Sequence, residues 1–112
     1  MGKLPWKNLI PVLAFYALIL SVSALPAYRI QKIDRSFHLP NDKVMHFSVY
    51  TVFGFLLGGL PYPSAVLGMT GSLLGALDEQ SQRLAPGRDV SVRDWFADIL
   101  GVSLGLALRR RR

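Results

Sequence analysis

The sequence predicts an all-α membrane protein, a bundle of four transmembrane helices in a single domain over residues 1–112. Half of the residues are hydrophobic and 18% are charged, whereas about a quarter of the residues in a soluble domain are charged. The mean hydropathy is +0.32. The hydrophobic residues form four blocks, and glycines recur at four-residue spacing in three of them.

The first helix is predicted over residues 9–27, an apolar stretch about as long as a bilayer span requires. Lys3 and Lys7 precede it, and Trp6 and Tyr28 flank it as expected at the two membrane interfaces. A cleavable signal peptide is the alternative. The apolar run is long for a signal peptide, and its removal would leave an odd number of spans.

The second helix is predicted over residues 43–60, after a turn in which Asn41 or Asp42 caps its N-terminus. An uncharged turn rich in glycine and proline follows, and the third helix is predicted over residues 64–82. The fourth helix is predicted over residues 92–108.

The apolar part of the fourth helix is short for a membrane span. Residues 95–108 make about 21 Å of helix, and the hydrocarbon core is about 30 Å thick. The polar ends of the third and fourth helices are therefore expected to enter the membrane, unless the bilayer thins around them.

Glycine pairs in the second, third and fourth helices predict close helix packing of the GxxxG type, because small residues let helix backbones approach each other in lipid. The pairs are Gly54 and Gly58, Gly71 and Gly75, and Gly101 and Gly105.

The chain is basic, with a net charge of +6. Its cations lie at the edges of the apolar blocks rather than along one amphipathic face, which favours loops beside a membrane over a nucleic-acid surface. The arginines at residues 109–112 indicate a stop-transfer and orientation signal. The chain contains no cysteine, which excludes a disulfide scaffold and a cysteine nucleophile.

Because spans alternate in direction, the start of the second helix, the end of the third and the start of the fourth meet on one side of the membrane. Six of the seven acidic residues lie at these ends or between them. Asp98 shares a helix face with Gly101 and Gly105, so it is expected to point into the bundle, and Arg88 and Arg93 are the natural partners of the acids. The candidate binding residues are Asp42, Lys43, His46, Asp78, Glu79, Gln82, Arg88, Asp94 and Asp98.

These residues form an ordered set of short motifs. The motifs are Asp42-Lys43-x-x-His46-Phe47-x-x-Tyr50, Asp78-Glu79-x-x-Gln82, Pro86-Gly87-Arg88 and Asp94-x-x-x-Asp98-x-x-Gly101. Over residues 40–105 this pattern resembles the VanZ-like family of small integral membrane proteins. The resemblance implies a membrane protein and a link to resistance against the glycopeptide teicoplanin. Asp98 departs from the pattern, because family members often carry asparagine there.

The predicted location is the bacterial cytoplasmic (inner) membrane, which the chain would cross several times. Six cations accompany the termini and seven lie on the other side, so charge counting alone does not set the orientation. Because several of the seven are expected to pair with acids, we predict cytoplasmic termini and a polar cluster on the outer face.

Three functions remain open. The first is binding of an anionic lipid or cell-wall precursor headgroup, with no cofactor and no nucleic-acid partner. The second is a hydrolase or transferase acting on a lipid-linked phosphate, with Glu79 or Asp78 as general base and His46 as proton donor. A variant of the enzyme would hold a divalent metal with Asp78, Glu79 and Asp94. The third is a structural role, as a homo-oligomer or as a subunit of an envelope complex.

Overall fold

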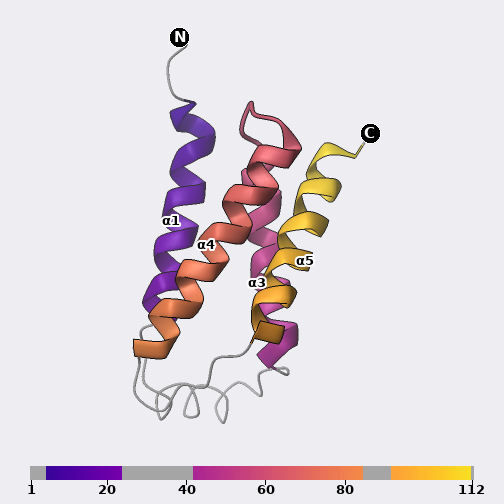
Figure 1. The fold of residues 1–112 in the computed structure, drawn as a ribbon. Coiled ribbons are helices and arrows are strands. Elements are labelled where there is room, and N and C mark those ends of the chain that lie inside the picture. Colours follow the sequence, from indigo (N-terminus) through magenta and orange to yellow (C-terminus); the bar gives the residue numbers. More distant parts are fainter. Residues whose placement is uncertain (1–4, 24–41, 85–91, 112) are drawn as a thin grey trace.

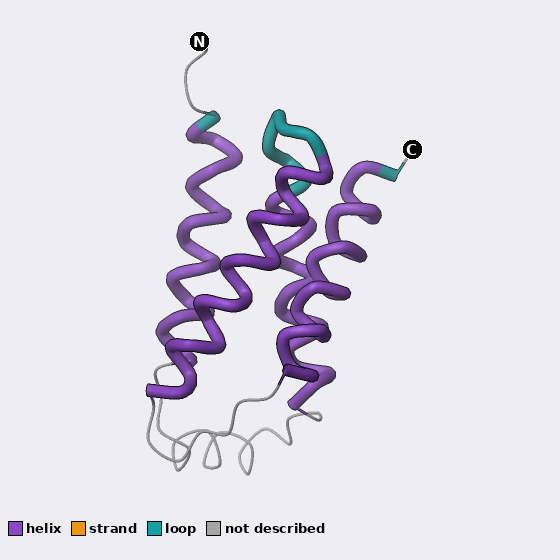
Figure 2. The backbone as a smooth tube through the Cα atoms, in the orientation of Figure 1, coloured by secondary structure: helices purple, strands orange, loops and turns teal. Residues whose placement is uncertain are grey.

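The computed structural model describes residues 5–23, 42–84 and 92–111, which form four helices and no strand. The helices are α1 (Trp6–Ser23), α3 (Asp42–Leu57), α4 (Ser64–Leu84) and α5 (Val92–Arg110). They run alternately in opposite directions (Figure 1), and a short loop joins α3 to α4 at the end where α1 begins and α5 finishes (Figure 2). The prediction of an all-helical chain with four helices is therefore confirmed.

Helix boundaries differ from the predicted ones by a few residues for local reasons. The Pro5 carbonyl accepts hydrogen bonds from the backbone N–H groups of Asn8 and Leu9, at 3.0 and 2.9 Å, so α1 begins ahead of the apolar block. At the end of α3, the N–H of Gly59 bonds the carbonyl of Leu56 at 3.1 Å, which tightens the chain into a turn. The residues predicted as the last turn of the first helix, 24–27, lie outside the described residues.

The third and fourth helices are longer than their apolar blocks. At 1.5 Å per residue, α4 is about 31 Å long and α5 about 28 Å, close to the thickness of a hydrocarbon core. Arg109 and Arg110 extend α5 because basic side chains stabilise the negative end of a helix dipole. The polar residues near the other end of each helix thus lie inside regular helix, as the predicted ranges 64–82 and 92–108 required.

The closest helix pair is α3 with α5, and glycine makes this contact. A Cβ atom on Gly101 would lie 2.6 Å from the carbonyl oxygen of Phe47. A Cβ atom on Gly105 would overlap the backbone of Thr51. On the opposite helix, Gly54 faces the backbone of Val102 in the same way. The two backbones approach so closely because none of these positions carries a side chain.

The remaining helices close around this pair through a small apolar core. Phe53 and Val102 are completely buried at its centre. The rings of Tyr16 and Phe53 stack with centroids 5.5 Å apart, which attaches α1 to α3. Tyr50 meets Phe53 edge-on at 5.8 Å, an arrangement that aromatic quadrupoles favour. The hydroxyl of Tyr16 also donates a hydrogen bond of 2.6 Å to the carbonyl of Leu74, which attaches α1 to α4.

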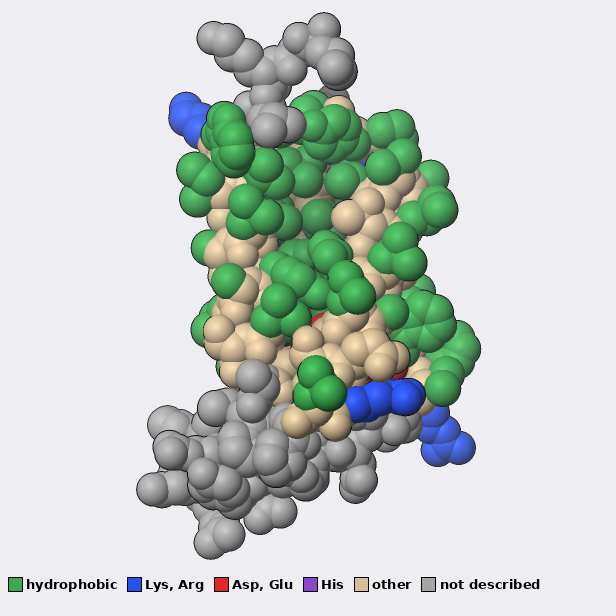
Figure 3. All heavy atoms as spheres, turned by 60° about the vertical axis from the view of Figure 1, so that its left-hand side comes forward, with side chains coloured by type: hydrophobic (Ala, Val, Ile, Leu, Met, Phe, Trp, Pro, Cys, Tyr) green, Lys and Arg blue, Asp and Glu red, His purple; other side chains and the backbone are tan. Residues whose placement is uncertain are grey.

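The outer surface of the bundle carries many large apolar side chains. Every helix contributes, for example Leu13, Val52, Leu73 and Leu100, each about half exposed or more. Figure 3 shows hydrophobic side chains over most of the visible face, with lysine and arginine side chains near its two ends. By length and composition, α1 qualifies as a membrane span, whereas the apolar part of α3 is shorter.

Five serine and threonine side chains on the helices bond to their own helix. Each donates a hydrogen bond of 2.7 to 2.9 Å to the carbonyl oxygen four residues earlier. This arrangement satisfies the hydroxyl without water or a neighbouring helix. The residues are Ser21, Thr51, Thr70, Ser72 and Ser103.

Arg110, at the end of α5, holds the connection between α3 and α4. Its guanidinium donates hydrogen bonds to the carbonyls of Leu60 and Tyr62, at 2.8 and 2.6 Å, and to that of Gly58 at 3.3 Å. It also donates to the hydroxyl of Ser64 at 2.9 Å. One side chain therefore binds three carbonyls of the connection and the hydroxyl of the first residue of α4.

Candidate functional site

The inside of the bundle holds a group of polar side chains, here called the polar cluster. They come from all four helices, at the end where α1 and α4 finish and α3 and α5 begin. Such groups are buried only where they meet partners, because burying an unpaired polar group costs free energy. The members are Ser23, His46, Tyr50, Asp78, Glu79, Gln82, Asp94 and Asp98.

Asp78 lies at the centre of the cluster and is 1% exposed. One carboxylate oxygen accepts a hydrogen bond of 2.8 Å from the hydroxyl of Tyr50 on α3, and the other accepts one from the hydroxyl of Ser23 on α1. Gln82, one turn along α4, donates a 3.5 Å hydrogen bond to the same Ser23 hydroxyl. Asp78 therefore joins three helices through its two oxygens.

His46 and Asp98 form a second pair, between α3 and α5. Nδ1 of His46 lies 2.8 Å from Oδ1 of Asp98, and the Asp98 side chain is completely buried. A Cβ atom on Gly75 would lie 3.4 Å from the other oxygen, Oδ2. That oxygen has no hydrogen-bond partner among the described residues.

Glu79 reaches from α4 to the first turn of α5, where the backbone N–H of Trp95 donates a hydrogen bond to its carboxylate. The first N–H groups of a helix have no partner within the helix, and a carboxylate there also stabilises the helix dipole. Glu79 is 7% exposed and lies within range of the charges of Asp94, Arg83 and His46. Its second oxygen, Oε1, has no hydrogen-bond partner among the described residues.

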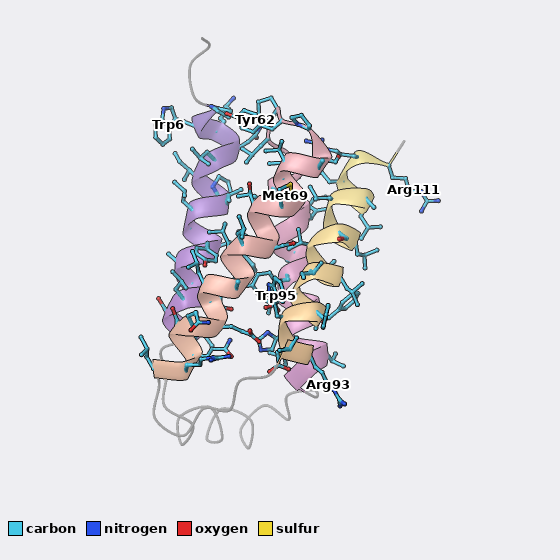
Figure 4. All side chains as sticks on the ribbon, in the orientation of Figure 1. Trp6, Tyr62, Met69, Arg93, Trp95 and Arg111 are labelled. Atoms are coloured by element: carbon cyan, nitrogen blue, oxygen red, sulfur yellow. The ribbon has the colours of Figure 1, made fainter. Side chains whose placement is uncertain are left out.

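The described cations at this end lie outside the cluster. Arg83 and Arg93 are exposed, and Arg93 points away from the bundle (Figure 4). The sequence suggested Arg93 as a partner of the acids, but its position at the start of α5 turns it outward. The polar cluster is thus rich in carboxyl groups, with arginines at its rim.

Six of the nine predicted site residues are buried in the cluster. Asp42 and Lys43 lie in the first turn of α3, but their side chains are outside the described part of the structure. Arg88 lies outside the described residues altogether. The six are His46, Asp78, Glu79, Gln82, Asp94 and Asp98.

Two cluster members were not among the predicted site residues. Tyr50 lies one turn after His46, so four-residue spacing places both on the same face of α3. Ser23 is the last residue of α1, and a serine at the end of an apolar helix gives no periodic signal. Only the direction of the first helix, which ends at the same end of the bundle as the cluster, could have indicated it.

The described part of the cluster shows no metal-binding arrangement, and a surface hollow lies elsewhere on the bundle. Among the described residues, no group of three or more carboxylate, histidine or cysteine side chains is arranged to hold a metal ion, which disagrees with the metal variant on Asp78, Glu79 and Asp94. A hollow of about 450 Å³ lies between α4 and α5, farther along the bundle. Its lining is Ala65, Gly68, Met69, Ser72, Leu73 and Ser103.

Chemically, the cluster can accept hydrogen bonds, exchange protons between histidine and carboxyl groups, and present carboxylates beside exposed arginines. No protein-family model, curated protein or solved structure matches the chain. The function is therefore argued from these residues and their surroundings.

Proposed function

We propose that this chain is an integral membrane protein that crosses the bilayer four times and binds the headgroup of an anionic lipid, or of a lipid-linked envelope precursor, at the polar cluster. The observation that carries the proposal is the distribution of side chains, which is the reverse of that in a soluble protein. Large apolar residues cover the outside, while carboxyl, imidazole and hydroxyl groups fill one end of the inside.

Lipid is the solvent that suits this surface. A monomeric soluble protein rarely exposes large continuous apolar patches, yet all four helices expose leucine, valine or phenylalanine. In a bilayer, ionisable residues are expected to face the bundle interior and pair with one another, as His46 and Asp98 do. The lengths of α4 and α5 and the resemblance to the VanZ-like family support the same proposal.

The two ends of the bundle suit membrane interfaces. Trp6 and Tyr62 are exposed at the end that also carries Arg111 (Figure 4), and aromatic residues with basic neighbours are typical of the headgroup region. Arg83 and Arg93 are exposed at the opposite end, beside the polar cluster. The cluster would then lie close to the headgroups on that side.

An anionic headgroup fits the rim of the cluster. The exposed guanidinium groups of Arg83 and Arg93 can each bind a phosphate, and the sequence places Lys43 and Arg88 near the same helix ends. The buried carboxyls would hold the polar remainder of the headgroup.

The orientation can be tested with single cysteines, because the natural chain has none. Tyr62→Cys and Leu84→Cys place exposed thiols at opposite ends of the bundle. With cytoplasmic termini, an impermeant thiol reagent added to intact cells labels position 84 and not position 62. The reverse pattern contradicts the orientation, and equal labelling of both contradicts the four-span topology.

Binding can be tested by native mass spectrometry of the gently solubilised protein. The wild type should retain an anionic lipid, and the double variant Arg83→Ala/Arg93→Ala should lose it. Arg111→Ala removes one positive charge at the opposite end and should keep the lipid. A folded wild type that retains no lipid contradicts the proposal and favours a structural subunit of an envelope complex.

A second candidate is a membrane-embedded hydrolase or transferase acting on a lipid-linked phosphate. Two contacts favour it: the Ser23 hydroxyl bonds a buried carboxylate, and His46 is paired with Asp98, which are the elements of general acid–base chemistry. Turnover of a phosphorylated lipid by pure protein, abolished by Asp78→Asn, would establish this function. A link to teicoplanin resistance rests on the family resemblance alone, and susceptibility of a deletion strain would test it.

A further inference from the structure

We infer that the headgroup bound at the polar cluster carries hydroxyl groups beside its phosphate, as a polyol phosphate or a sugar phosphate does, and that Glu79 accepts a hydrogen bond from one of these hydroxyls. The inference rests on the proposed function and names the chemical class of its ligand.

The first observation is an unused acceptor. Oε1 of Glu79 is buried and has no hydrogen-bond partner among the described residues. Buried polar atoms in native proteins are nearly always paired, so each exception requires an explanation. A ligand that brings a hydrogen-bond donor to Oε1 would give this buried atom its missing partner.

The second observation is that Glu79 is held in place. The backbone N–H of Trp95 bonds its carboxylate at the start of α5, which accounts for the glutamate as a cap but uses only part of its accepting capacity. A carboxylate fixed by one hydrogen bond and open at the other oxygen is preorganised to receive a donor.

A second open acceptor lies nearby on α5. Oδ2 of Asp98 is buried, also without a hydrogen-bond partner among the described residues. His46 bonds the other oxygen of Asp98 and lies within range of the charge of Glu79, so one histidine interacts electrostatically with both carboxyls. Two open acceptors favour a ligand with more than one donor, which is a property of polyols and sugars.

Hydroxyl groups fit this site better than an ammonium group. An ammonium next to a phosphate makes a headgroup with no net charge, whereas the chain carries +6 and exposes Arg83 and Arg93 at the rim. A headgroup that keeps its negative charge and adds hydroxyls satisfies both the arginines and the open acceptors.

Three lipids with identical acyl chains test the inference: phosphatidylglycerol, phosphatidic acid and phosphatidylethanolamine. Native mass spectrometry of the wild type, titrated with each lipid, should show phosphatidylglycerol retained about tenfold more strongly than phosphatidic acid, as a hydrogen bond to a charged group predicts. Phosphatidylethanolamine should bind more weakly than phosphatidylglycerol.

Glu79→Gln then tests the residue. The amide keeps a carbonyl oxygen that can accept from Trp95, but it replaces the open acceptor by an NH₂ donor. We expect an unchanged melting temperature, a lost preference for phosphatidylglycerol and retained binding of phosphatidic acid. Gln80→Ala, at the exposed neighbouring position, should keep the preference.

The outcomes separate the two proposals. Equal retention of phosphatidylglycerol and phosphatidic acid, with both lost in Arg83→Ala/Arg93→Ala, overturns the inference and leaves the proposed function standing. Retention of no lipid overturns both. Preference for phosphatidylethanolamine, or a preference for phosphatidylglycerol that survives Glu79→Gln, also overturns the inference. If Glu79→Gln does not fold, the comparison of the three lipids in the wild type decides whether the inference stands.

Discussion

Asp78 shows how a carboxylate can be stable inside a helix bundle. It is buried, and it accepts hydroxyl hydrogen bonds from Ser23 and Tyr50, which come from two other helices. Hydrogen bonds to a charged acceptor are stronger than those between neutral groups. Removing this carboxylate takes an acceptor from two buried hydroxyl groups, which costs more than removing one donor.

Asp78→Ala should therefore lower the free energy of unfolding by about 2–6 kcal/mol, since two buried hydroxyl donors each lose an acceptor. Tyr50→Phe, which removes one donor, should cost less. Thermal unfolding in detergent, followed by tryptophan fluorescence in a Trp6→Phe background, measures both, because the Trp95 ring donates a 3.0 Å hydrogen bond from α5 to the Ser72 carbonyl on α4. Leu77→Ala, on the exposed side of α4, is the control. An Asp78 effect no larger than that control contradicts the central role of the carboxylate.

What the sequence could predict about the cluster depends on the kind of signal each residue gives. The inward direction of Asp98 follows from its spacing to Gly101 and Gly105, and the structure buries it completely. Arg93 is one residue before Asp94, and the sequence does not indicate which of the two faces outward. Ser23 gives no signal, because its partner Asp78 lies 55 positions away.

Among the helices, α3 and α5 depend on glycine for their close approach. Gly101 and Gly105 lie against the backbone of α3, so even one methyl group would have to displace a helix. Gly68 on α4 is different, since a Cβ there would lie 3.7 Å from the nearest atom, Cδ1 of Leu106. The spacing of glycines predicted the contact, but only the structure separates the essential glycine from the permissive one.

Gly101→Ala should destabilise the bundle strongly or prevent its folding, because the new methyl group meets the carbonyl oxygen of Phe47 at 2.6 Å. Gly68→Ala should be neutral or stabilising, since alanine favours helix over glycine by about 1 kcal/mol. Yield of folded protein after detergent extraction and its melting temperature compare the two. Equal behaviour of the variants would contradict the assigned packing of α3 on α5.

Arg110→Ala should loosen the connection between α3 and α4, because three carbonyls and the Ser64 hydroxyl lose their donor. Hydrogen exchange in residues 58–63 should become faster, while exchange in the middle of α4 stays unchanged. Arg111→Ala provides the control, since that neighbour is exposed. Unchanged exchange in Arg110→Ala would show that the loop holds its shape without the arginine.

At the scale of the whole molecule, the apolar outer surface and the polar cluster buried inside one end of the bundle reverse the pattern of a soluble protein. The hydrophobic blocks of the sequence predicted four helices, and four are present in the described part of the chain. The predicted ranges 64–82 and 92–108 end two residues before α4 and α5 do, although polar turns interrupt the apolar runs of both helices. Burial of these turns depends on the other helices, which block lengths do not include.

Introducing a charged side chain on the outer surface tests whether the bundle lies in a membrane or in water. Leu73 is 64% exposed in the middle of α4, and Leu84 is 87% exposed at its end. In a bilayer, Leu73→Arg should cost about 2.5–3.5 kcal/mol on insertion scales, whereas Leu84→Arg should be tolerated near the headgroups. Abundance in the membrane fraction measures both. Normal abundance of Leu73→Arg, with protein in the soluble fraction, would contradict membrane insertion.

The hydroxyls that bond to their own helices differ from those of the polar cluster in when their hydrogen bonds can form. Those of Thr70, Ser72 and Ser103 need only one helix, so these bonds can form as soon as that helix exists. The bonds of Asp78 need three helices at once. We therefore expect separate helices to form first and the cluster to close last, which would make final assembly cooperative. Asp78→Asn should then keep its helix content by circular dichroism even where the fluorescence of Trp95 reports a loosened bundle.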